Sequence, residues 1–158
     1  MLLKNLIQED FSNYKTCAMF LGFPSCSWKC EKECGMKGIC QNSALASSPS
    51  IDVPVSRILL MYASNPLSRA VVCGGLEPFD SWPELQYFIQ SFRVCNSDPI
   101  IIYTGYTSDE LEAEIQWLKK FSNIIIKFGR FRPNEEPHFD AVLGVKLAST
   151  NQYAERIS

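Results

Sequence analysis

Four of the seven cysteines in the chain lie within the fifteen residues from Cys26 to Cys40. The segment is rich in lysine, glutamate and glycine, so packing gives no reason for cysteines to gather there. Thiolates at this spacing can converge on one metal centre, because a short loop can wrap around an ion or a cluster and point several sulfurs inward. The segment therefore predicts a metal or iron–sulfur site, with Cys26, Cys30, Cys34 and Cys40 as the candidate ligands.

The three remaining cysteines are expected to be buried or partly buried free thiols. Cys17 and Cys73 lie in apolar, strand-like runs, and Cys95 is interpreted in the same way. An odd total argues against a complete disulfide framework. The first ten residues show no signal-peptide core, so we expect a cytoplasmic protein whose cysteines stay reduced.

Composition excludes several classes of function. The net charge is −2 and the isoelectric point is near 5.4, which argues against nucleic acid or an anionic membrane surface as the main partner. No apolar run reaches the roughly 18 residues of a membrane span. With 158 residues, of which 46% are hydrophobic, the chain is expected to form one folded domain over residues 1–158.

Strand-like and helix-like segments alternate along the chain. Apolar runs predict buried strands, and i, i+3, i+4 spacing predicts amphipathic helices. Ser81 with Glu84, and Thr107 with Glu110, have the spacing of helix-starting capping boxes. Strands are expected at 16–22, 70–73, 99–103, 123–128 and within 139–147, and helices at 53–63, from Ser81 and from Thr107. This order predicts an α/β fold with a mainly parallel sheet, preceded by an N-terminal segment of ambiguous structure.

Four irregular segments directly follow predicted strands. They are the cysteine segment, Gly74 to Phe79, Thr104 to Tyr106, and Gly129 with Arg130. Because the carboxyl ends of parallel strands meet at one edge of a sheet, we expect these segments to form one composite site. The two adjacent glycines, Gly74 and Gly75, would let a ligand approach the backbone closely, and Glu77 could pair with a cationic group.

These residues resemble the radical S-adenosylmethionine (SAM) proteins, and most closely the activating proteins of anaerobic ribonucleotide reductase. The similarity covers most of the chain from Cys17 onward. It depends on Cys26-x3-Cys30, on Gly74 to Pro78 after a strand, and on Tyr103 to Thr107 before a helix. A late Gly129-Arg-Phe131 and Ser149 to Gln152 also resemble that group.

The chain departs from the family pattern at two places. The family has Cys-x3-Cys-x2-Cys, whereas here the third cysteine is either Cys34, one residue late, or Cys40, followed by Gln41 and Asn42. We predict Cys26, Cys30 and Cys40 as the ligands, with Cys34 as the alternative third ligand. Leu76 is an extra residue in what is usually Gly-Gly-acid-Pro, so it is open whether Glu77 takes the place of the family's acid.

The resemblance implies a partial (βα) barrel with the cysteine loop after its first strand. It also implies a [4Fe-4S] cluster with one iron left for SAM. Reductive cleavage of SAM would give a 5′-deoxyadenosyl radical, which would install a glycyl radical on the large subunit of anaerobic ribonucleotide reductase, with a flavodoxin- or ferredoxin-type electron donor. The residues expected to hold SAM are Gly74, Gly75 and Glu77 at its ammonium end, and Asn42, Thr104 and Arg130 at its ribose or carboxylate.

Two other functions remain open from the sequence. The same chemistry could act on another peptide or on a small molecule. Alternatively, all four clustered cysteines could hold zinc in a binding or structural module without turnover.

Overall fold

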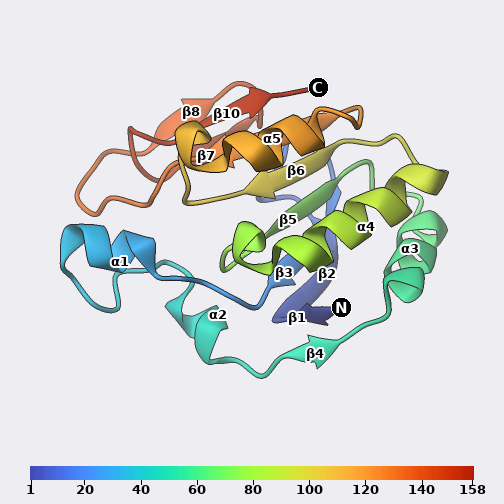
Figure 1. The fold of residues 1–158 in the computed structure, drawn as a ribbon, viewed down its shortest axis with the longest axis horizontal. Coiled ribbons are helices and arrows are strands. Elements are labelled where there is room, and N and C mark those ends of the chain that lie inside the picture. The colour runs from blue at the N-terminus through green and yellow to red at the C-terminus, as the bar shows by residue number, and fades with distance from the viewer.

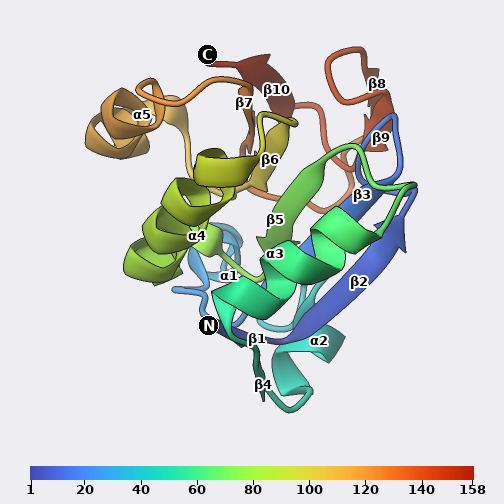
Figure 2. The ribbon, with the colours of Figure 1, turned by 90° about the vertical axis from the view of Figure 1, so that its right-hand side faces the viewer.

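A six-stranded sheet forms the middle of the molecule in this computed structural model, which describes residues 1–158. Its strands run in the order β10–β7–β6–β5–β3–β2. The four inner strands are parallel to one another, whereas β2 and β10 pair antiparallel at the two edges (Figure 2). The expected α/β fold with a mainly parallel sheet is thus confirmed. The strands are β2 (Asn5–Asp10), β3 (Ala18–Phe23), β5 (Val71–Gly75), β6 (Ile100–Tyr103), β7 (Ile124–Phe128) and β10 (Tyr153–Arg156).

The inner strands are buried on both faces, which explains their continuous apolar sequences. Successive side chains point to opposite faces, so Ile100 and Ile102 of β6 join one core cluster while Ile101 joins the other. The larger cluster contains 21 buried residues and the smaller one eight.

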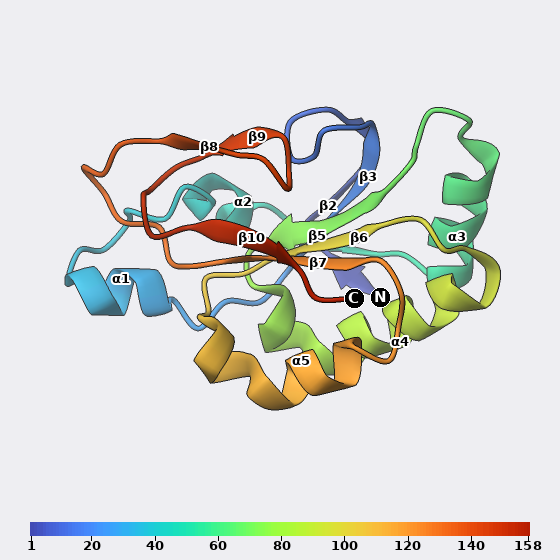
Figure 3. The same ribbon diagram turned by 90° about the horizontal axis from the view of Figure 1, so that it is seen from above.

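Helices cover the face that carries the larger cluster (Figures 1 and 3). They are α3 (Val55–Ser64), α4 (Trp82–Cys95) and α5 (Glu112–Leu118), and short 3-10 turns, η1 (Pro78–Ser81) and η2 (Ser108–Leu111), lead into α4 and α5. The longest helix, α4, has 14 residues, and none of the helices could cross a membrane.

A hairpin lies over the opposite face of the sheet (Figure 3). It consists of β8 (His138–Asp140) and β9 (Val145–Leu147). Leu143 and Leu147 from this hairpin pack with Ile101 and Ile125 of the sheet. The hairpin therefore supplies the cover that a helix supplies on the other side.

The structure differs from the sequence-based expectation at both ends of the chain. The ambiguous N-terminus forms β1 (Leu2–Leu3) and β2, and β1 pairs with β4 (Ile51–Asp52). The cysteine segment therefore follows the third strand of the chain, although β3 is the first of the parallel set. The single strand predicted within 139–147 is the β8–β9 hairpin, and the last strand of the main sheet is the unpredicted β10, whose short, partly exposed sequence carries little apolar signal.

The two predicted helix starts have different outcomes. The backbone N–H of Thr107 donates to the Glu110 carboxylate at 3.0 Å, as the capping pattern predicts. Helix α4 begins directly after Ser81, as predicted, but the Ser81 side chain makes no capping hydrogen bond, so the predicted capping box with Glu84 is not formed. The turn η1 runs straight into α4 there, and Glu77 caps η1 by accepting from the N–H of Phe79.

Candidate functional site

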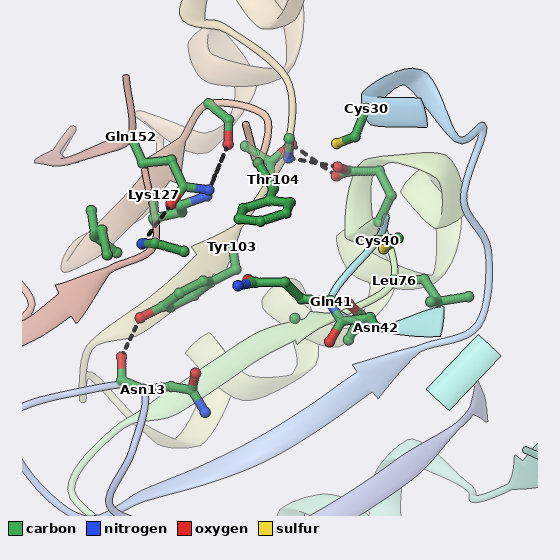
Figure 4. A pocket seen from close by; sticks show the side chains of 18 of the residues that line it. Asn13, Cys30, Cys40, Gln41, Asn42, Leu76, Tyr103, Thr104, Lys127 and Gln152 are labelled. Carbon is green, nitrogen blue, oxygen red and sulfur yellow. Dashed lines mark hydrogen bonds between the residues drawn. The ribbon is translucent and has the colours of Figure 1, made fainter. Parts of the chain in front are cut away.

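A cavity of about 350 Å³ opens at the carboxyl ends of the parallel strands. All four irregular segments contribute to its wall, so the predicted composite site forms at this edge of the sheet. Figure 4 shows Cys30 and Cys40 on one side of it and Lys127 with Gln152 on the other. The wall includes Cys26, Cys30, Cys40, Gln41, Asn42, Gly74, Gly75, Leu76, Glu77, Tyr103, Thr104, Gly105, Lys127, Gly129 and Gln152.

Three of the four clustered cysteines line this cavity. Cys26, Cys30 and Cys40 are half-buried free thiols in its wall, whereas Cys34 is exposed at the end of α1 (Lys29–Cys34) and lies outside it. Cys40 comes after α1 and just before α2 (Ser43–Ser47). Of the two candidate third ligands, Cys40 thus lines the cavity and Cys34 does not.

Of the other cysteines, Cys17 and Cys73 are buried free thiols, as expected. Cys95 is a free thiol but is exposed at the end of α4, so the expectation that it is buried or partly buried is wrong. The last turn of this helix presents it to solvent.

The donor set of the cavity fits a thiophilic metal centre that retains an open coordination position, because it offers three sulfurs from one short segment of the chain. Burial raises the pKa of the Cys26 thiol to about 11 and also raises the pKa of Cys30, so both are protonated at neutral pH and a metal must displace their protons. No three metal-ligating side chains stand close enough to hold an ion in the arrangement seen here. Loading would therefore have to draw the sulfurs together.

Glu77 lies in the wall of the cavity and is only 5% exposed. Its carboxylate accepts hydrogen bonds from the Thr104 hydroxyl at 2.8 Å, the Gly105 N–H at 2.8 Å and the Phe79 N–H at 3.2 Å. Burial raises its pKa to about 7, against the opposing effect of these donors. Glu77 therefore joins the ends of β5 and β6 and also places an ionisable carboxylate in the cavity.

The two glycines that end β5 are required by packing as well as by the cavity. At Gly75, where φ is +85°, an added Cβ would lie 2.7 Å from the Cα of Gly22 in β3. At Gly74 it would lie 3.0 Å from the Phe20 ring. Close approach of β3 thus accounts for the Gly-Gly pair, and the backbone of both glycines still reaches the cavity.

Asn42 and Thr104 line the cavity, but Arg130 does not. The Asn42 side-chain amide donates to the carbonyl of Gly75 at 2.5 Å. Arg130 forms ion pairs with Glu110 at 2.6 Å and with Glu33 at 3.0 Å. Its guanidinium is therefore engaged with the outer side of the cysteine segment, and the structure does not bring it to the predicted ligand position.

Several polar side chains that were not predicted from the sequence also line the cavity, among them Lys127 and Gln152. Lys127 of β7 is 7% exposed and donates to the carbonyl of Gly129 at 2.9 Å, and burial lowers its pKa to about 8. The Gln152 side chain donates to the same carbonyl at 3.3 Å and accepts from the N–H of Ala148 at 3.0 Å. The lysine within the apolar run Ile-Ile-Ile-Lys-Phe was a signal that could have identified Lys127.

The cavity combines thiols, a carboxylate and an ammonium group around space for one small molecule. Such a set can hold a metal centre at one end and a zwitterionic ligand beside it. Comparison of the chain with protein-family models, curated proteins and solved structures finds no match.

Proposed function

We propose that this chain is a radical SAM iron–sulfur protein that activates a glycyl-radical enzyme. The observation that carries the proposal is that Cys26, Cys30 and Cys40 line one cavity together with Gly75 and Glu77. A loop with three thiols beside a glycine-rich strand end is the arrangement that binding of SAM at a cluster requires. The four parallel strands with their helices on one face are consistent with a partial (βα) barrel.

In this proposal, different residues of the cavity hold the cluster and SAM. Cys26, Cys30 and Cys40 would hold a [4Fe-4S] cluster, and Glu77 would pair with the ammonium group of SAM. When bound, such a cluster would supply the electron for reductive cleavage of SAM. Lys127 offers a cation to an anionic group, while Tyr103 and Leu76 help to exclude water.

A protein substrate suits the size of the site. A cavity of about 350 Å³ lies at the small end of ligand pockets, so a cluster with SAM beside it leaves little room for a further molecule. The group that loses a hydrogen must then be presented from outside. The proposed partner is a glycyl-radical enzyme such as the large subunit of anaerobic ribonucleotide reductase, with a flavodoxin or ferredoxin as electron donor.

The test is performed without oxygen on matched cysteine variants. The protein is reconstituted with iron and sulfide, reduced with dithionite and given SAM, and 5′-deoxyadenosine is measured. We expect production to be lost in Cys26→Ala, Cys30→Ala and Cys40→Ala and to persist in Cys34→Ala, with Cys95→Ala as a second control.

Two results would contradict this assignment. If Cys34→Ala abolishes production and Cys40→Ala does not, the third ligand is Cys34. A colourless protein that holds zinc and makes no 5′-deoxyadenosine would show that the site is a binding module without turnover.

A further inference from the structure

We infer that Asp80 and Tyr106 are positioning residues that hold the turn between Cys26 and Cys30 in the shape that presents both thiols to the cavity. The inference rests on the proposed thiol site. It assigns a function to two side chains that neither line the cavity nor belong to the cysteine segment.

The turn between the two cysteines has an unfavourable backbone conformation. Trp28, in its middle, has φ +57° and ψ +35°, the left-handed region that a bulky side chain rarely adopts. Such a conformation is unfavourable and persists only when its surroundings hold it. Within the turn, one hydrogen bond of 3.3 Å, from the N–H of Trp28 to Cys26 Sγ, supports this conformation.

Asp80 holds the turn on the Cys26 side. One carboxylate oxygen accepts from the backbone N–H of Ser27, and the other accepts from the Tyr106 hydroxyl at 2.6 Å. The N–H of Glu77 also donates to the carbonyl of Ser25 at 2.7 Å. The residues on both sides of Cys26 are therefore tied to the segment that follows β5.

Tyr106 holds the turn on the Cys30 side as well. The ammonium group of Lys29, the residue before Cys30, lies 4.1 Å from the centre of the Tyr106 ring. The same ammonium group forms an ion pair with Glu110 at 3.1 Å. Asp80 and Tyr106 thus contact the residues that flank Trp28, and together they oppose relaxation of the left-handed turn.

The Cys40 side of the segment has a separate attachment. Asn42 binds the Gly75 carbonyl there, with no contact to Asp80 or Tyr106. Removing the Tyr106 hydroxyl should therefore disturb the pair Cys26 and Cys30 while leaving Cys40 in place.

The experiment measures Co²⁺ binding to the metal-free, reduced protein through the thiolate-to-cobalt absorption band. Tyr106→Phe keeps the ring and removes the hydroxyl, and Tyr87→Phe, at an exposed tyrosine of α4, makes the same change elsewhere. We expect Tyr106→Phe to weaken Co²⁺ binding by about 10-fold or more, the usual effect of losing support behind a metal ligand. Tyr87→Phe should bind like wild type.

A second variant protects the test against a folding defect. Asp80→Ala removes both hydrogen bonds and should weaken Co²⁺ binding at least as much as Tyr106→Phe does. Thermal unfolding of the metal-free protein shows whether each variant is folded. Unchanged Co²⁺ affinity in both folded variants would overturn the positioning role and leave the proposed function intact. If wild type itself shows no thiolate-to-cobalt band, the thiol site and the positioning role both fail.

Discussion

Burial and hydrogen bonding have opposite effects on the ionisation of Glu77 in the cavity. Three hydrogen-bond donors favour its ionised form, while almost complete burial disfavours it. Burial is the larger effect, because the pKa is raised from 4.5 to about 7. A cationic ligand bound beside Glu77 would lower its pKa, because a nearby positive charge favours the ionised carboxylate.

The raised pKa of Glu77 predicts a pH-dependent stability. Between pH 4.5 and about 7, the Glu77 carboxyl binds more protons in the folded state than in the unfolded state. The stabilisation that protonated Glu77 contributes is therefore complete below pH 4.5 and is lost as the pH rises through 7. The loss amounts to about 3 kcal/mol at most. Urea unfolding of the metal-free protein should show that the stability of wild type relative to Glu77→Gln falls between pH 5 and pH 7.5. A constant difference would contradict this prediction.

At the scale of elements, the ends of neighbouring strands are joined backbone to backbone. The N–H of Leu76 donates to the carbonyl of Phe23 at 3.2 Å, so β5 continues alongside the start of the cysteine segment. Gly75 makes this approach possible, because its left-handed backbone turns the chain while a side chain would strike β3. The position of the cysteine segment therefore depends on a glycine in another strand.

A Gly75→Ala substitution tests this dependence. The new Cβ would lie within 3 Å of the backbone of Gly22 and Phe23, which cannot yield as a flexible side chain would. We expect a loss of about 3 kcal/mol or more in the free energy of unfolding. Gly38→Ala is the matched control, since Gly38 also has positive φ but nothing near its Cβ position, and it should cost only about 1 kcal/mol. Equal losses would show that the approach of β3 is unimportant.

At the scale of the whole molecule, the sheet is covered unequally. Three helices cover one face, whereas the other is covered mainly by the β8–β9 hairpin and the loop around Tyr14. Val145 and Leu147 of the hairpin also form part of the cavity wall. Packing of the hairpin and the shape of the cavity are therefore coupled.

Substitutions in the hairpin should separate its buried side from its exposed side. Leu143 is fully buried against the sheet, so Leu143→Ala should lower the free energy of unfolding by about 2–4 kcal/mol. Phe139 is 64% exposed, so Phe139→Ala should change the free energy of unfolding by about 0.5 kcal/mol or less. Denaturant unfolding of both variants measures the difference. A small effect of Leu143→Ala would mean that the hairpin is not a structural cover.

Much of the fold and part of the site could be predicted from local pattern. Continuous apolar runs such as Ile100 to Tyr103 predicted buried parallel strands, and strand ends predicted one shared edge. That rule was sufficient to bring Cys26, Gly75, Thr104 and Gly129 to one cavity. Strand β10 and the hairpin were missed, because short edge strands and turns lack a strong periodic signal.

By itself, the sequence determined the strand alternation, the edge of the sheet that carries the cavity and most of the candidate residues around it. Only the tertiary structure decided which of them face the cavity. It placed Cys40 in the wall and Cys34 outside, paired Arg130 with acids away from the cavity, and brought in Lys127. The physical reason is that side-chain direction and charge pairing depend on neighbours distant in the chain, such as Glu110 beside Arg130, and no local spacing encodes those contacts.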